Sequence, residues 1–180
     1  LEKDKDVIAA PYPMKYIDWP KVERRMKALN LTSIDEIAKA GFHYPVKVEG
    51  MYEVIVDDGV AEVTHAPTGC MLIKRDVIKK MMKQYPDLRI HQPTLINGVE
   101  DYKKNFYNLF ECLHDPSTKQ YFGEDFGFCK RWTEMGGKIH LYCMDFISHT
   151  GEYEYCGRYW DELLASKKAI DAREKSVDVS

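Results

Sequence analysis

The spacing of apolar residues switches along the chain between short continuous runs and a period close to that of a helix. The run Val7–Ala10 is apolar and is closed by Pro11 and Pro13, which predicts a buried strand that ends in an extended loop. Charged stretches with apolar residues at helical spacing predict helices. The further predicted strands cover residues 72–73, 105–112, 139–141 and 145–147, and the predicted helices cover residues 20–29, 75–83, 124–135 and 160–172.

A local signal marks one more helix. Ser33 and Glu36 form a Ser-x-x-Glu capping box before Ile37, and Gly41 is the residue at which this helix is expected to stop. Arg24 and Arg25 lie in the amphipathic pattern just before it, and we expect them on a solvated face.

Two longer segments break the helical pattern. Valines alternate with other residues from Val46 to Val63 around a turn at Asp57-Asp58-Gly59, which predicts an antiparallel hairpin. Residues 86–107 contain the breakers Pro93 and Asn97-Gly98, so we expect an irregular loop there.

Strands and helices therefore alternate, with one hairpin inserted. This order predicts an α/β fold in which helices flank a mixed sheet. Residues 1–180 are expected to form a single domain, because 180 residues with 44% hydrophobic content suffice for one substantial core.

Charge and cysteine content narrow the function. The formal net charge is −3, and the basic residues are scattered among acids, which argues against nucleic acid as the main partner. No apolar run is long enough to span a membrane, and no signal peptide is evident. The five cysteines show no zinc-ligand spacing. Most have apolar neighbours, as Cys112 does, so we expect buried, reduced thiols and a cytoplasmic location.

Three short features carry candidate chemistry. Glu124 and Asp125 lie where a loop becomes a helix; acids there complement the helix dipole, but a carboxylate can also accept a proton from a sugar hydroxyl. His149 ends a predicted strand, where an imidazole is either structural or a ligand of a divalent ion. Thr68 and Gly69 form a turn of small residues, which is either an ordinary tight turn or a place where a ligand approaches the backbone.

In this order the segments resemble the acceptor half of nucleotide-sugar glycosyltransferases of the GT-A fold. The resemblance is carried by residues 6–13, 68–75, 121–132 and 136–151. It implies a partial GT-A-like domain that transfers a sugar from a nucleotide-diphosphate donor to a carbohydrate acceptor. Within that family pattern, Asp125, with Glu124 beside it, matches the catalytic base of inverting enzymes, His149 matches a ligand of Mn or Mg, and Thr68 and Gly69 line the sugar pocket.

The sequence also departs from the family. The nucleotide-binding region and the Asp-x-Asp metal motif that precede residues 6–13 in the family are not found here, and neither Asp4-Lys5-Asp6 nor Asp57-Asp58 is in the right place to replace the motif. We therefore expect the donor site to come from a preceding region or from an oligomeric partner. Two alternatives stay open: a non-catalytic module that binds carbohydrate or protein, and a metal-dependent hydrolase that uses Glu124, Asp125, His149 and His114 or His140.

Overall fold

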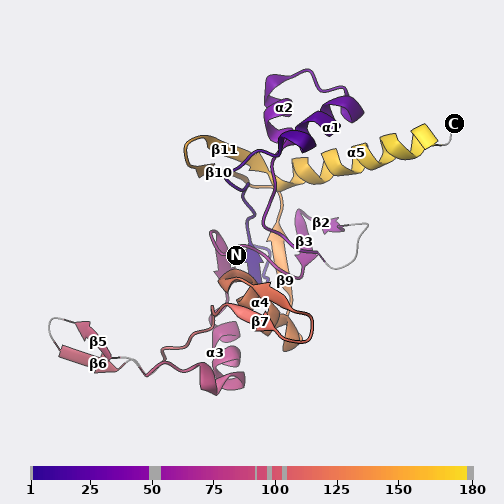
Figure 1. Ribbon diagram of the computed structural model, residues 1–180. Coiled ribbons are helices and arrows are strands. Elements are labelled where there is room, and N and C mark those ends of the chain that lie inside the picture. Colours follow the sequence, from indigo (N-terminus) through magenta and orange to yellow (C-terminus); the bar gives the residue numbers. More distant parts are fainter. Residues whose placement is uncertain (1, 49–53, 92, 97–98, 103–104, 178–180) are drawn as a thin grey trace.

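The computed structural model describes residues 2–48, 54–91, 93–96, 99–102 and 105–177 (Figure 1). Within them, a five-stranded sheet lies between two groups of helices. Helices α1 (Trp19–Leu29), α2 (Ile34–Ala40) and α5 (Tyr159–Val177) lie at one end of the molecule, and helices α3 (Arg75–Gln84) and α4 (Glu124–Glu134) lie at the other.

The five-stranded sheet is mixed, as the sequence predicts. Its strand order is β2-β3-β9-β1-β4. Only the central pair, β1 and β9, is parallel, and each of the other neighbours is antiparallel. The strands are β1 (Val7–Ala9), β2 (Val56–Asp57), β3 (Val60–Val63), β4 (Met71–Ile73) and β9 (Ile139–Tyr142).

The central strands carry the core on one face, where buried residues alternate along each strand with half-buried residues on the other face. Val7, Ile139 and Leu141 are completely buried, and so are Met81 from α3 and Phe128 from α4. Apolar residues at helical spacing thus place one face of α3 and one face of α4 against the sheet.

The predicted helices form, with one local difference. Asp18 caps α1 by accepting a hydrogen bond from the Lys21 amide at 2.9 Å. Ser33 occupies the N-cap of α2, as the capping box predicts. Its side chain, however, makes no capping hydrogen bond.

Three further hairpins were not predicted in full. They are β5 (Pro93–Ile96) with β6 (Val99–Tyr102), β7 (Leu113–Asp115) with β8 (Gln120–Phe122), and β10 (Phe146–Thr150) with β11 (Glu154–Arg158). The expected irregular loop over residues 86–107 is therefore wrong, since it contains the 3-10 helix η1 (Pro86–Leu88) and the β5–β6 hairpin; Asn97-Gly98 lies outside the described residues.

One other strand prediction is wrong, and the predicted hairpin is confirmed in part. Residues 105–112 form no strand: among the described residues they contribute one isolated bridge, between Arg89 and Tyr107, because no neighbouring strand continues the ladder. The predicted hairpin over Val46–Val63 is confirmed for β2 and β3 around Asp58-Gly59, while residues 49–53 lie outside the described part.

The cysteine prediction holds for two positions. Cys129 and Cys143 are buried, and burial raises the pKa of each thiol to about 11. Cys112 is exposed, contrary to the expectation from its apolar neighbours. In the described part of the chain, no helix has both the length and the apolar character needed to cross a membrane.

Candidate functional site

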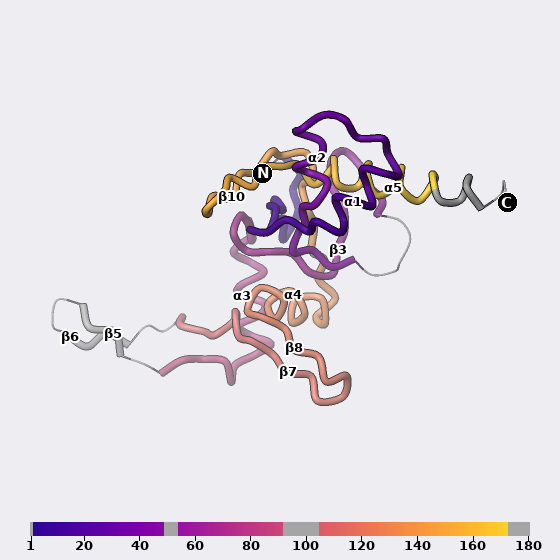
Figure 2. The backbone as a smooth tube through the Cα atoms, turned by 45° about the horizontal axis from the view of Figure 1, so that its top comes forward, coloured from indigo at the N-terminus to yellow at the C-terminus, as the bar shows by residue number. Residues whose placement is uncertain are grey.

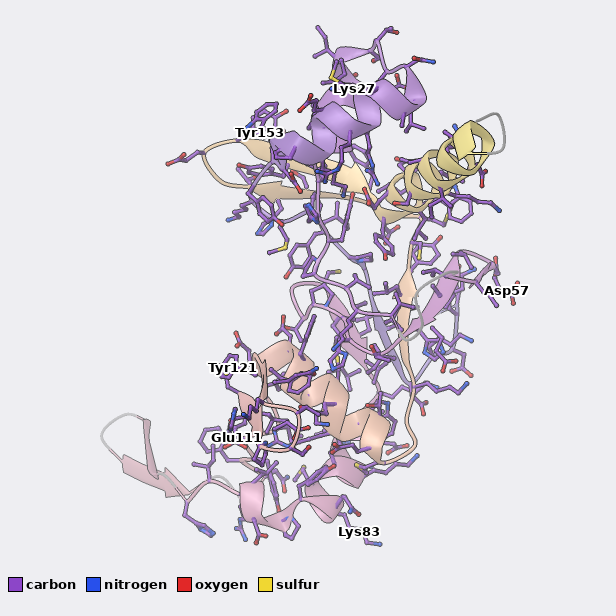
Figure 3. The ribbon with its side chains drawn as sticks, turned by 45° about the vertical axis from the view of Figure 1, so that its right-hand side comes forward. Lys27, Asp57, Lys83, Glu111, Tyr121 and Tyr153 are labelled. Atoms are coloured by element: carbon purple, nitrogen blue, oxygen red, sulfur yellow. The ribbon has the colours of Figure 1, made fainter. Side chains whose placement is uncertain are left out.

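The start of helix α4 presents its two adjacent carboxylates to different surroundings. Glu124 is exposed, and the Sγ atom of Cys112 lies 3.8 Å from its Oε2 atom. Figure 3 shows Tyr121 and Glu111 beside this helix. Asp125 is half-buried and turns instead towards the Thr68 turn. The two acids that the sequence presents as a pair therefore do not share one site.

Thr68 orients the Asp125 carboxylate with two hydrogen bonds. The Thr68 amide donates to Oδ2 at 3.1 Å, and the Thr68 hydroxyl donates to Oδ1. This bidentate contact fixes the carboxylate plane, because each oxygen is held by a separate donor on the same residue. The predicted catalytic residue and the predicted substrate-binding turn are thus in direct contact.

Tyr12 packs against the same turn from the end of strand β1. Gly69 leaves the space for its ring: a Cβ atom at Gly69 would lie 2.6 Å from Cε1 and 2.9 Å from the hydroxyl oxygen of Tyr12. Gly69 is therefore needed here for the close approach of an aromatic ring from the chain itself.

Burial and charge act together on the Tyr12 hydroxyl. Its pKa is raised, first because the phenol is partly buried and then because the Asp125 carboxylate is close; the backbone of Gly69 opposes both effects. Tyr12 is consequently neutral at pH 7 and can donate or accept a hydrogen bond.

His149 reaches this group of residues from the β10–β11 hairpin. Its ring stands edge-on to the Tyr12 ring, with 4.9 Å between the centroids. Its Nδ1 atom lies 2.9 Å from the Pro13 carbonyl oxygen, which can only accept, so Nδ1 carries the proton. The Nε2 atom of neutral His149 therefore keeps its lone pair.

His149 does not lie in the main sheet. A strand end at the crevice of the main sheet was expected, but β10 belongs to a separate two-stranded sheet. The residue nevertheless comes to the carboxyl end of β1, because Pro11 and Pro13 carry the chain from β1 in an extended path to the hairpin.

Of the candidate site residues, His149 is the one that fits a metal ligand in the described part of the chain. In the ranges that the structure describes, no three histidine, cysteine, aspartate or glutamate side chains are grouped so as to hold a metal ion. The His149 imidazole fits the role of one nitrogen ligand, since its second nitrogen is fixed by a carbonyl as in metal-bound histidines. Within the described residues, His149 is therefore not part of a group of three such side chains.

Tyr12 is the contact residue that sequence reasoning missed. It lies inside the segment 6–13 that carries the family resemblance, but no role was assigned to it. The available signal was its place between two prolines directly after a buried strand, where the chain leaves the sheet. Comparison of the chain with protein-family models, with curated proteins and with solved structures finds no match.

Proposed function

We propose that the chain is the acceptor-side part of a nucleotide-sugar-dependent glycosyltransferase, with Asp125 as the catalytic base. The observation that supports this proposal most directly is the meeting of three separate segments around Tyr12. The Thr68 turn, the start of α4 and the β10–β11 hairpin bring Asp125 and His149 to the same ring. Neither side chain is sealed in the apolar interior, because both are half-buried.

The proposed chemistry is a single displacement at the anomeric carbon of the donor sugar. The acceptor hydroxyl oxygen bonds to that carbon as the bond to the nucleoside diphosphate breaks, and the hydroxyl proton passes to a carboxylate oxygen of Asp125. Each carboxylate oxygen can accept more than one hydrogen bond. An oxygen of Asp125 that already accepts a bond from Thr68 can therefore also accept one from the hydroxyl of the sugar acceptor. The product has the inverted configuration because only one displacement occurs.

His149 has a supporting part in this proposal. When a divalent ion, Mn or Mg, is bound, it would offset the negative charge that develops on the leaving diphosphate. The Nε2 atom of His149 would be one of its ligands, held in direction by the Nδ1 contact with Pro13.

The adjacent carboxylates allow a matched test of the base. We expect Asp125→Asn to lower transfer by about 10²–10⁴-fold while the donor still binds, because the amide cannot take the proton. The control is Glu124→Gln, which changes an exposed carboxylate one residue away. Both variants are assayed for sugar transfer and for donor binding in a protein that carries this chain together with a donor-binding region.

The outcomes separate the proposal from its alternatives. Unchanged turnover in Asp125→Asn would end the assignment, and equal losses in both variants would remove the distinction between the two acids. Carbohydrate binding without transfer would favour the non-catalytic module. For His149→Ala, we expect donor binding to lose its dependence on Mn, and an unaltered response to Mn would contradict the ligand role.

A further inference from the structure

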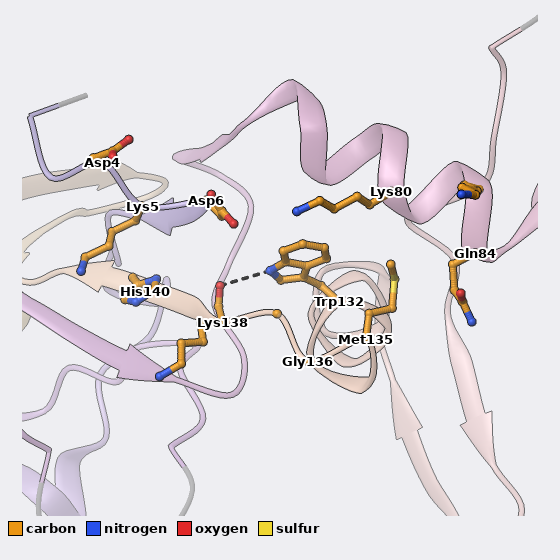
Figure 4. A pocket seen from close by; sticks show the side chains of 12 residues that line it. Asp4, Lys5, Asp6, Lys80, Gln84, Trp132, Met135, Gly136, Lys138 and His140 are labelled. Carbon is orange, nitrogen blue, oxygen red and sulfur yellow. Dashed lines mark hydrogen bonds between the residues drawn. The ribbon is translucent and has the colours of Figure 1, made fainter.

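A separate cavity of about 750 Å³ lies at the other end of the central strands (Figure 4). Strands β1 and β9 are parallel and both begin at this cavity; Tyr12 lies three residues beyond the opposite end of β1. A three-residue strand is about 10 Å long, so the cavity is distinct from the proposed glycosyltransferase site. It is lined by Asp4, Lys5, Asp6, Lys80, Lys83, Gln84, Trp132, Met135, Gly136, Gly137, Lys138 and His140.

Lysines dominate the charge of this cavity. Four lysines line it against two aspartates, Asp4 and Asp6. Both aspartates pair with Lys74, at 2.8 and 3.2 Å, and Lys74 itself does not line the cavity. Lys74 therefore offsets one of the two negative charges of the lining from outside.

Most of the lining lysines have no carboxylate partner in the described part of the chain. Lys138 pairs with Glu62 at 2.7 Å, whereas no ion pair is formed by Lys5, Lys80 or Lys83 with the residues that the structure describes. Lys80 instead lies over the indole of Trp132, with Nζ 5.9 Å from the ring centroid.

The floor of the cavity is fixed. Trp132 is 4% exposed, and its Nε1 atom donates to the Lys138 carbonyl at 3.2 Å, as the dashed line in Figure 4 marks. Gly137 packs flat on the indole, since a Cβ atom there would lie 2.1 Å from the ring. Lysines on helix α3 and on the turns before β1 and β9 thus surround a rigid apolar floor.

We propose that this cavity binds a phosphate-bearing ligand, with Lys5, Lys80 and Lys83 as its cationic contacts. Ammonium groups on flexible stems bind phosphate as point charges, and several of them suit a multiply charged anion. The volume exceeds that of a single phosphate, so the ligand carries either a second phosphate or an organic group that covers the Trp132 floor. The same chemistry occurs in soluble diphosphates and in phospholipid headgroups.

Helix α3 supplies both the test variant and its control. Lys80 and Lys83 are exposed, so the double change Lys80→Gln and Lys83→Gln should leave the fold intact. Lys79 lies on the same helix, pairs with Asp76 at 3.1 Å and does not line the cavity, so Lys79→Gln is the control. Binding is measured by calorimetry with pyrophosphate and by co-sedimentation with phosphatidylcholine vesicles that do or do not contain phosphatidic acid.

We expect the double variant to bind about tenfold or more weakly than the wild type, and Lys79→Gln to bind as the wild type does. Pyrophosphate binding alone would identify a soluble ligand, and binding to the acidic vesicles alone would identify a lipid headgroup; both outcomes support the proposal. Equal losses in the control, or no binding of either probe by the wild type, would overturn it. Asp125→Asn should bind both probes normally, so failure of the proposed function would not affect this result.

Discussion

His65 is a polar side chain placed almost entirely among aromatic rings. It is 8% exposed, stacks on Phe122 with 5.5 Å between the centroids, and lies 4.7 Å from the Phe126 ring. Burial, followed by the charges of Lys47 and Lys130, lowers the pKa of His65 to about 4. Its Nε2 atom has no hydrogen-bond partner in the described part of the chain, so protonation there would place an uncompensated charge in the cluster.

This pKa predicts a loss of stability in acid. The pKa of His65 is lower in the folded protein than its ordinary value of 6.5, so the unfolded chain binds the proton first as the pH falls. The free energy of unfolding should decrease by up to about 1.4 kcal/mol per pH unit between pH 6.5 and pH 4. His65→Phe should remove this part of the pH dependence, measured by urea unfolding across that range. The same acid slope in the variant and the wild type would contradict the prediction.

The sequence shows which residues carry reactive groups, but it does not show which residues contact them in the folded chain. Asp125 and His149 were selected as candidates because a carboxylate at a predicted helix start and an imidazole at a predicted strand end are visible in the sequence. The contact between Asp125 and Thr68 joins residues 57 positions apart, and no local pattern records it. Arg25 shows the same limit: the predicted solvated side chain is only 7% exposed because α5 covers it.

Helix α4 depends on one glycine to reach its place. Gly127 lies in the second turn of the helix, and a Cβ atom there would lie 2.2 Å from the Glu111 carbonyl oxygen. The chain segment before β7 thus crosses the helix in direct backbone contact. Phe128 is buried next to this crossing and stacks on Phe110, with 4.5 Å between the ring centroids.

Gly127→Ala should therefore destabilise the protein, although the same change in an ordinary helix stabilises it by about 1 kcal/mol. We expect the free energy of unfolding to fall by about 1–3 kcal/mol, because a backbone oxygen cannot move aside as a side chain can. The control is Gly123→Ala at the N-cap of the same helix, where an added Cβ meets nothing within 4 Å and the expected cost is about 0.5 kcal/mol. A stabilised Gly127→Ala variant would show that the crossing is not tight.

Elements with a strong period were predictable, and short hairpins were not. Helices α1, α3 and α4 and strands β1, β4 and β9 form where the apolar spacing places them. The β7–β8 hairpin depends on a side chain instead: Asp115 accepts from the Ser117 hydroxyl at 2.6 Å and from the Ser117 amide at 2.9 Å. These bonds lower the pKa of Asp115 to about 2 and fix the turn, whereas the flanking strands have only three residues each.

At the scale of the whole molecule, the parallel pair β1 and β9 has a different chemistry at each end. The end at Tyr12 presents Asp125 and an imidazole, and the end at Lys138 presents a lysine-lined cavity. Residues from the first and the last thirds of the sequence meet at both ends, since β1 and β9 are separated by more than 100 residues and pair directly. Both arrangements therefore depend on how the two ends of the chain are held together.

One carboxylate joins helix α1 to helix α5. Glu162 on α5 accepts two hydrogen bonds from Arg25 on α1, at 2.7 and 2.8 Å, and one from Lys21 at 3.0 Å. Figure 2 shows α1 and α5 side by side at this contact. Burial lowers the pKa of Lys21, and the negative charge of Glu162 opposes that effect, so this carboxylate compensates two cations that water reaches poorly.

Glu162→Gln should consequently cost far more than the loss of a surface ion pair. The amide leaves the buried Arg25 charge without its partner, and we expect the free energy of unfolding to fall by about 3–5 kcal/mol. The control is Glu23→Gln on α1, which removes the exposed pair with Lys27 and should change nothing measurable. Hydrogen exchange should become faster along α5 in Glu162→Gln alone. If α5 keeps its protection in that variant, the helix is held by its apolar contacts, Leu163 and Trp160 among them, and not by the ion pair.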